Sequence, residues 1–345
     1  MNRSTRPRLA LVALGAALAV GGTRDSTASE PVTAEPARPV FDDAFWRLWG
    51  DGRAELAGYE LIYDRYGEPR RGTAVTVFVT ETFAGPPRVK HERASRPEGH
   101  TFPVMKLNLM QDFPTGIYDY HLMTSTFVAL GDSAFSRSGA PTKISFSSQE
   151  WCGQVYSQLL FDAEEVRYQS HSYFDGEADA ADVLDLPADG LAEDALLPWA
   201  RGMTAPLLQP GESRAVRLLR SLERSRLRHL PSEWLPATLH RSASPEQIRV
   251  PAGVFEVDRL DVRIEPPATQ ATYPPESRRA EPTTRSWTFL VERAPARRVV
   301  RWERSDGTTA ELLGEARLPY WELNGAGLES EVERLGLTPR PPRTP

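Results

Sequence analysis

Two histidines and several carboxylates within residues 101–179 are the side chains of this sequence best suited to chemistry. Asp119 and His121 are two residues apart, so in a β-strand they share one face. His171 stands four residues before Asp175, which begins an acidic turn. Carboxylates with imidazole can hold zinc, and carboxylates alone can hold calcium. These four residues are the candidate metal ligands, although an acidic solvated turn is the simpler interpretation and no HExxH or EF-hand spacing is present.

A metal-dependent hydrolase centred on Asp119, His121 and His171 is therefore one functional hypothesis. The single cysteine, Cys152, offers another, with either histidine as its base. Nothing in the surrounding SQEWCGQ marks an activated thiol, and the neighbouring Trp151 favours a buried, inert cysteine. The sequence has no GxSxG, P-loop or dinucleotide pattern. It assigns no catalytic residue and predicts no cofactor, so a protein without enzymatic activity is favoured.

Aromatic and aliphatic side chains suggest a binding surface instead. Tyr118, Tyr120 and Leu122 alternate on one face of a predicted strand, and Trp287 and Phe289 do so on another. If the sheet curves, one such face is concave and can hold an apolar ligand. The alternative is that these five residues are ordinary core.

The elements that would position these residues are mostly β-strands. Between residues 73 and 83, valines alternate with threonines, which is typical of a half-buried strand. Residues 105–109 and 117–130 alternate as well, and the turn-forming residues 112–116 between them predict a hairpin. Further strands are expected at 59–66, 144–160, 166–174, 254–264, 287–291, 299–304 and 308–321.

The remaining segments are less regular. Residues 41–58 predict one short amphipathic helix, which Asp42 or Asp43 can cap and Gly50 can end. Residues 191–201 predict another helix, which ends at Gly202. Residues 215–230 fit a helix about as well as a strand. The acidic stretch 175–189 is expected to be a surface connection. Within residues 254–264, the alternation of apolar residues changes phase near Asp258 and Arg259, which predicts a β-bulge.

These elements predict a mainly β fold, a large curved antiparallel sheet or half barrel with a few short helices. We expect residues 41–335 to form a single domain, with two lobes at about 41–180 and 205–335 as the alternative. Residues 336–345 are expected to be a disordered tail.

The beginning of the chain predicts export. Arginines precede the apolar run 9–20, and small residues lead to a cleavage site after Ala28, so residues 1–28 resemble a secretory signal. The run is shorter than the roughly 20 residues that a membrane span needs. Residues 29–40 form a Pro/Ala linker. The mature chain is expected to be soluble, in the periplasm or outside the cell, and to have no transmembrane span.

Composition excludes one class of partner. The formal net charge is −6 before the arginine-rich leader is removed, so general nucleic-acid binding is disfavoured. The remaining candidates are a lipid or another apolar ligand, or a partner protein of the cell envelope.

Four segments, FWRLWGDG, MKLNLMQDFPTGIYDY, SFSSQEWCG and SHSYFDGEAD, resemble a family of exported bacterial proteins of unknown function. Such proteins are sometimes labelled septum-formation inhibitor Maf, but true Maf proteins are cytoplasmic nucleotide pyrophosphatases, and this chain lacks their phosphate-handling pattern. Residues 250–324 are similar to the final hairpins of half-barrel envelope proteins such as the bacterial lipoprotein carriers. That resemblance implies an apolar ligand on a concave sheet.

Overall fold

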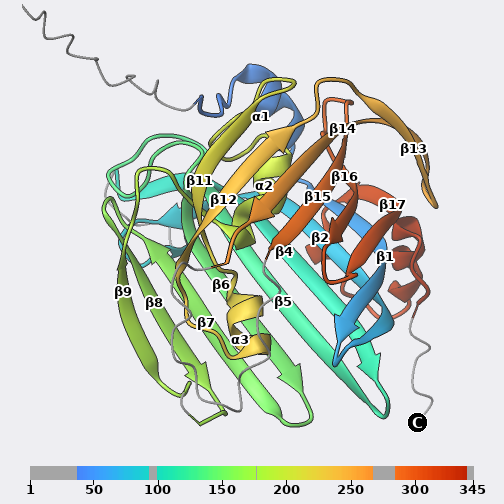
Figure 1. Ribbon diagram of the computed structural model, residues 1–345. Helices are drawn as coiled ribbons and strands as arrows, with labels where there is room; N and C mark the ends of the chain where they lie inside the picture. The colour runs from blue at the N-terminus through green and yellow to red at the C-terminus, as the bar shows by residue number, and fades with distance from the viewer. Residues whose placement is uncertain (1–36, 93–98, 176, 267–283, 340–345) are drawn as a thin grey trace, which may run out of the picture. The chain divides into compact units, whose positions relative to one another are not determined.

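A single mixed sheet of 17 strands dominates the structure, a computed structural model that describes residues 37–92, 99–175, 177–266 and 284–339 (Figure 1). The sheet is not closed into a barrel. The prediction of a mainly β fold with a large curved sheet and few short helices is confirmed. The predicted signal peptide, most of the linker, the proline-containing residues 267–283 and the last six residues lie outside the described residues.

Neighbouring strands pair antiparallel throughout the described sheet except for β10 and β11, which are parallel. β3 (Val89–Lys90) pairs with the end of β2, and β13 (Glu246–Val250) pairs with the start of β14. From one edge to the other, the order is β9 (Ala180–Asp185), β8 (Glu165–Ser172), β7 (Gly153–Phe161), β6 (Pro141–Glu150), β5 (Tyr118–Ala129), β4 (Thr101–Thr115), β2 (Glu68–Ala84), β1 (Ala54–Arg65), β17 (Thr309–Leu318), β16 (Val299–Arg304), β15 (Arg285–Glu292), β14 (Gly253–Ile264), β12 (Trp234–Arg241), β11 (Ser213–Leu219) and β10 (Gly190–Ala192).

The predicted hairpin of residues 105–130 is formed by β4 and β5. Met105 and Leu107 are buried, whereas Lys106 between them is only partly covered, as the alternation predicts. The turn lies later than expected, because the strands stay paired as far as Thr115 and Tyr118. Phe113 and Thr115 continue the buried alternation, so the strand runs through most of the predicted turn.

Three α-helices of the described residues lie between or beside the strands. α1 (Asp43–Trp49) begins at Asp42, whose carboxylate accepts a hydrogen bond from the Phe45 amide, and ends at Gly50. The predicted cap at Asp42 and the predicted end at Gly50 are both confirmed, and β1 begins at Ala54. The segment 215–230, which fitted a helix about as well as a strand, contains one of each: the end of strand β11 and, after it, helix α3 (Leu222–Arg228). The predicted helix 191–201 is β10, the 3-10 turn η1 (Glu193–Ala195) and α2 (Leu196–Ala200).

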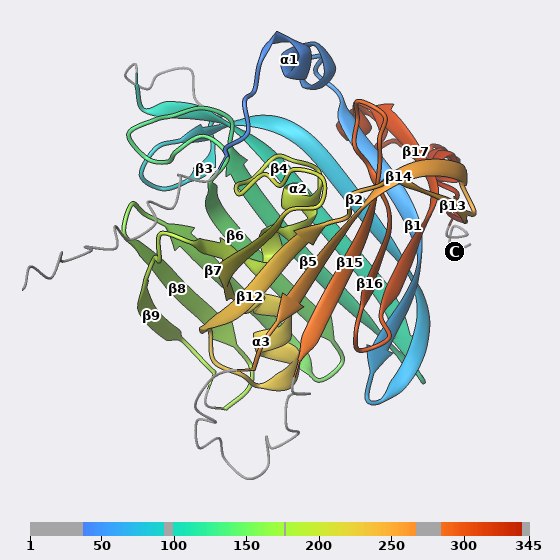
Figure 2. The ribbon, with the colours of Figure 1, turned by 45° about the horizontal axis from the view of Figure 1, so that its top comes forward.

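The inner face of the sheet is covered from within the same chain. In Figures 1 and 2, α2 and α3 lie inside the curve, between β4–β7 and β12–β15. Leu122 of β5 and Phe289 of β15 belong to one buried cluster, although six strand pairings separate their strands. β1 pairs with both β2 and β17, and it thereby joins the two predicted lobes in one sheet.

Two local predictions need correction. The stretch 175–189 contains an edge strand, β9, which pairs with β8 although it has no regular apolar alternation. At Asp258 there is no register shift against β15; the change of phase occurs where the neighbour of β14 changes from β13 to β12. Asp258 is buried there because it pairs with Arg241, Arg293 and Arg297.

The C-terminal part ends in two 3-10 segments, η3 (Tyr320–Glu322) and η4 (Glu329–Leu335). Leu335 packs with Leu56 and Val77 in a second, smaller cluster. None of the described helices is both long and apolar enough to cross a membrane.

Candidate functional site

The predicted metal ligands do not converge. Asp119 and His121 are exposed on β5, and the Nδ1 atom of His121 lies 2.5 Å from the Oδ1 atom of Asp112. His171 is three strand spacings away on β8, or about 14 Å, and its Nδ1 atom pairs with Asp179 at 2.7 Å. Within the described ranges, no group of three or more His, Cys, Asp or Glu side chains could hold a metal ion.

Cys152 is exposed, which corrects the expectation of a buried cysteine. Trp151 and Cys152 form the turn between β6 and β7, so the strand alternation no longer directs them inward, and Trp151 is 73% exposed. A hydrogen bond to Glu150 and the negative charge of that residue raise the pKa of the Cys152 thiol. This environment disfavours the thiolate and does not activate a nucleophile.

The predicted ligand-binding residues fall into two groups. Tyr120 and Leu122 are core residues at 1% and 2% exposure, and Tyr118 packs beside them. Trp287 and Phe289 stack with ring centroids 5.5 Å apart, and both line a small internal cavity. Trp287 lines both of the cavities described below and Phe289 lines one of them, whereas Tyr118, Tyr120 and Leu122 line neither.

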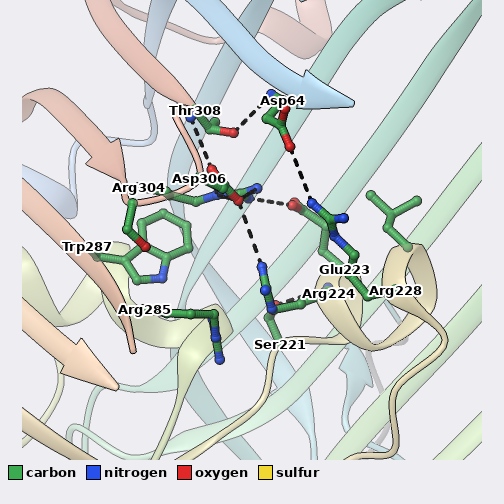
Figure 3. Close-up of polar contacts among 12 residues, drawn as sticks. Asp64, Ser221, Glu223, Arg224, Arg228, Arg285, Trp287, Arg304, Asp306 and Thr308 are labelled. Atoms are coloured by element: carbon green, nitrogen blue, oxygen red, sulfur yellow. Dashed lines mark hydrogen bonds and ion pairs between the residues drawn. The ribbon is translucent and has the colours of Figure 1, made fainter. Parts of the chain in front are cut away.

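A buried polar cluster lies where α3 approaches the inner face of the sheet (Figure 3). Its centre is Glu223 of α3, which is 8% exposed. Glu223 accepts hydrogen bonds from the Tyr63 hydroxyl at 2.7 Å and from the Gln111 amide at 2.7 Å. Its third partner is the Arg304 guanidinium, also at 2.7 Å. One carboxylate therefore joins α3 to β1, β4 and β16.

Arg304 connects the cluster to the β16–β17 turn. Its guanidinium donates to Asp306 at 2.6 Å and lies over the rings of Tyr63 and Trp287. Burial alone would raise the pKa of Asp306, but the charge and hydrogen bonds of Arg304, with a bond from the Thr308 amide, hold that pKa well below its usual range. Asp306 is therefore a fixed negative charge at neutral pH.

A second buried carboxylate, Glu193 of η1, lies next to this cluster. It pairs with Arg285 at 2.7 Å and accepts hydrogen bonds from the Trp287 indole at 2.9 Å and the Ser221 amide at 3.1 Å. Burial opposes ionisation, but the charge and hydrogen bond of Arg285, followed by the Trp287 bond, lower the pKa of Glu193 to about 2. The ion pair fixes η1 and the start of α3 against β15.

Asp194, the next residue, has the opposite character. Its Oδ2 atom accepts a hydrogen bond from the Leu222 amide at 3.0 Å, and no ion pair with it is found in the described part of the chain. Burial raises its pKa to about 8, with contributions from the negative charges of Glu193 and Glu223. Asp194 is therefore mainly protonated at neutral pH and can donate a hydrogen bond into the space that it faces.

That space consists of two small adjoining cavities. The first, of about 30 Å³, is lined by the polar cluster. The second, of about 40 Å³, is mainly apolar and is lined by Asp194 with Leu107, Leu109, Thr124, Leu196, Leu197 and Phe289, among others. The two share Glu193, Ser221, Glu223 and Trp287. Each has room for one or a few water molecules.

Sequence reasoning identified Trp287 and Phe289 but missed the polar cluster. One signal was present: Glu193 and Asp194 interrupt LAEDALLPWA, which is otherwise apolar. A pair of acids within such a run indicates buried carboxylates with partners elsewhere in the chain. No family model matches this chain, and neither the curated proteins nor the solved structures include a significant match.

Proposed function

We propose that this protein binds a small apolar or amphipathic molecule on the inner face of its curved sheet, next to α2 and α3. The observation that carries the proposal is the apolar cavity beside Trp287, where the neutral carboxyl of Asp194 supplies one polar group. Binding sites for small molecules typically combine apolar walls with a few placed polar groups. The secretory pattern of residues 1–28 supports a role outside the cytoplasm.

The size of the cavity limits how such a molecule would bind. Sites for drug-sized ligands have volumes of about 300–1,000 Å³, whereas this cavity has about 40 Å³. A lipid chain would therefore have to displace the apolar side chains of α2, and α3 would have to move from β15. The bonds from the Ser221 and Leu222 amides to Glu193 and Asp194 hold the start of α3 in place. Binding would loosen these contacts.

The test is ligand binding by the mature protein, residues 29–345. Native mass spectrometry would detect a retained lipid, and titration of the delipidated protein with a hydrophobic fluorescent dye would show saturation at one site. Trp287→Ala should weaken dye binding at least tenfold because it removes a wall of both cavities.

Trp321→Ala is the matched control, since Trp321 is 44% exposed on η3 and lines neither cavity. Equal weakening by both substitutions would contradict the proposed location. The absence of both retained lipid and saturable dye binding would contradict the function itself.

A further inference from the structure

Two arginines, the partly exposed Arg65 and the buried Arg226, lack the close carboxylate partners that the buried Arg201 and Arg285 have. Arg65 ends β1 and donates to the Leu227 carbonyl at 3.1 Å, to the Tyr120 hydroxyl at 3.0 Å and to the Tyr66 hydroxyl at 3.4 Å. Its guanidinium lies over both tyrosine rings. None of the described carboxylates forms an ion pair with it.

Arg226 of α3, the residue before Leu227, is the second cation. Its side chain is 8% exposed and its guanidinium stacks on the Phe174 ring at 3.6 Å. Its Nε atom is buried without a hydrogen-bond partner. The ion pair with Glu177 is long, at 3.8 Å, and Glu177 itself pairs with His229 at 2.5 Å.

The surroundings leave this positive charge poorly compensated. Burial lowers the pKa of Arg226, and the positive charge of Arg65 adds to that shift, while Glu177, Tyr120 and Glu150 oppose it. A buried guanidinium without good hydrogen bonds is costly, and an oxyanion that accepts from its planar fork would remove the cost. By contrast, Arg285 and Arg201 at similar burial each have a carboxylate at 2.7 Å.

We propose that Arg65 and Arg226 form a binding site for a phosphate group. The hydroxyls of Tyr66 and Tyr120, which are hydrogen-bonded to each other at 2.7 Å, supply one further donor. Phosphate suits this set better than carboxylate, because its oxygens can accept from two guanidinium forks and a hydroxyl at once. The site does not depend on a ligand in the apolar cavity.

A free phosphate compound or a phospholipid headgroup could supply this group. A series of aromatic rings leads from the site to the surface. The ring centroids of Tyr120 and Tyr118 are 5.9 Å apart, and those of Tyr118 and the exposed Trp151 are 6.1 Å apart. Exposed tyrosine and tryptophan favour the interface between water and lipid. The experiment therefore has a free-phosphate arm and a vesicle arm.

The free-phosphate arm is a calorimetric titration of the mature protein with inorganic phosphate at constant ionic strength. We expect one saturable site, with affinity at least tenfold weaker in Arg65→Gln and in Arg226→Gln. The matched control is Arg249→Gln, which removes the same charge from an exposed arginine of β13. Circular dichroism checks that each variant is folded. If Arg226→Gln fails to fold, Arg226→Lys replaces it and should also weaken binding, because it keeps the charge but loses the fork.

The vesicle arm measures cosedimentation with phosphatidylglycerol or phosphatidylcholine vesicles. Vesicle binding that Arg65→Gln and Arg226→Gln weaken at least tenfold, and that Arg249→Gln leaves unchanged, would identify a lipid headgroup as the source. Binding of inorganic phosphate alone would identify a free phosphate compound. The proposal is overturned if neither arm shows saturable binding, or if Arg249→Gln weakens binding as much as the Arg65 and Arg226 substitutions do.

Discussion

Asp194→Asn is expected to change how the free energy of unfolding depends on pH. At low pH it should leave the free energy of unfolding almost unchanged. Asparagine has nearly the shape of the neutral aspartic acid, and its carbonyl can still accept the hydrogen bond from the Leu222 amide. It cannot ionise. The substitution therefore removes one titration and leaves the packing of the apolar cavity almost unchanged.

The sign and size follow from the pKa of Asp194, which is raised from 3.8 to about 8 in the folded protein. Between these values the folded state holds a proton that the unfolded state has lost, so stability falls as pH rises. The slope is at most about 1.4 kcal/mol per pH unit. From pH 5 to pH 7, the wild type should lose about 3 kcal/mol relative to Asp194→Asn.

The assay is urea unfolding of both proteins at half-unit steps between pH 4.5 and pH 9. The difference in free energy of unfolding should be smallest at the acid end, should grow in favour of Asp194→Asn up to about pH 8, and should then level off. Glu193 and Asp306 do not contribute in this window, because their pKa values are lowered. Parallel curves for the two proteins would refute a protonated Asp194.

Two further predictions concern other carboxylates. Glu193→Gln should lower the free energy of unfolding by about 3–5 kcal/mol, because it removes the buried carboxylate that pairs with Arg285 at 2.7 Å. Urea unfolding measures this, and a loss below about 1 kcal/mol would contradict a structural ion pair. Cys152 should react with Ellman's reagent in the native protein because it is exposed. Glu150→Gln should speed the reaction at pH 8 because Glu150 raises the pKa of the thiol. A thiol that reacts only after unfolding would contradict the exposed turn.

The strands were predictable where one face is buried and the other is not. Period-two alternation identified most of β2, β5 and β15 and the middle of β4, because one face of each packs against the core. β9 was missed, since its residues are mostly exposed and have no such alternation. The phase change of β14 was recognised but assigned to a bulge, because a single sequence does not show that a strand exchanges neighbours.

The candidate site was predictable only in part. Trp287 and Phe289 stand out as apolar residues of one strand. The partners of Glu223 do not, because Tyr63 lies 160 positions away in the sequence and Gln111 lies 112 positions away. Arg65 and Tyr120 are likewise 55 positions apart. Such pairings depend on how far the sheet curves, which local patterns do not specify.

The amino-acid sequence alone determined the class of this protein: alternation and turn residues specify strands locally, and their number requires a large curved sheet. Only the tertiary structure decided what fills the curve and which charges meet there. Burial makes an unpartnered charge costly, so the roles of Glu193, Asp194 and Arg226 depend on groups that come from other parts of the sequence. Those groups become neighbours only when the sheet has curved around α2 and α3.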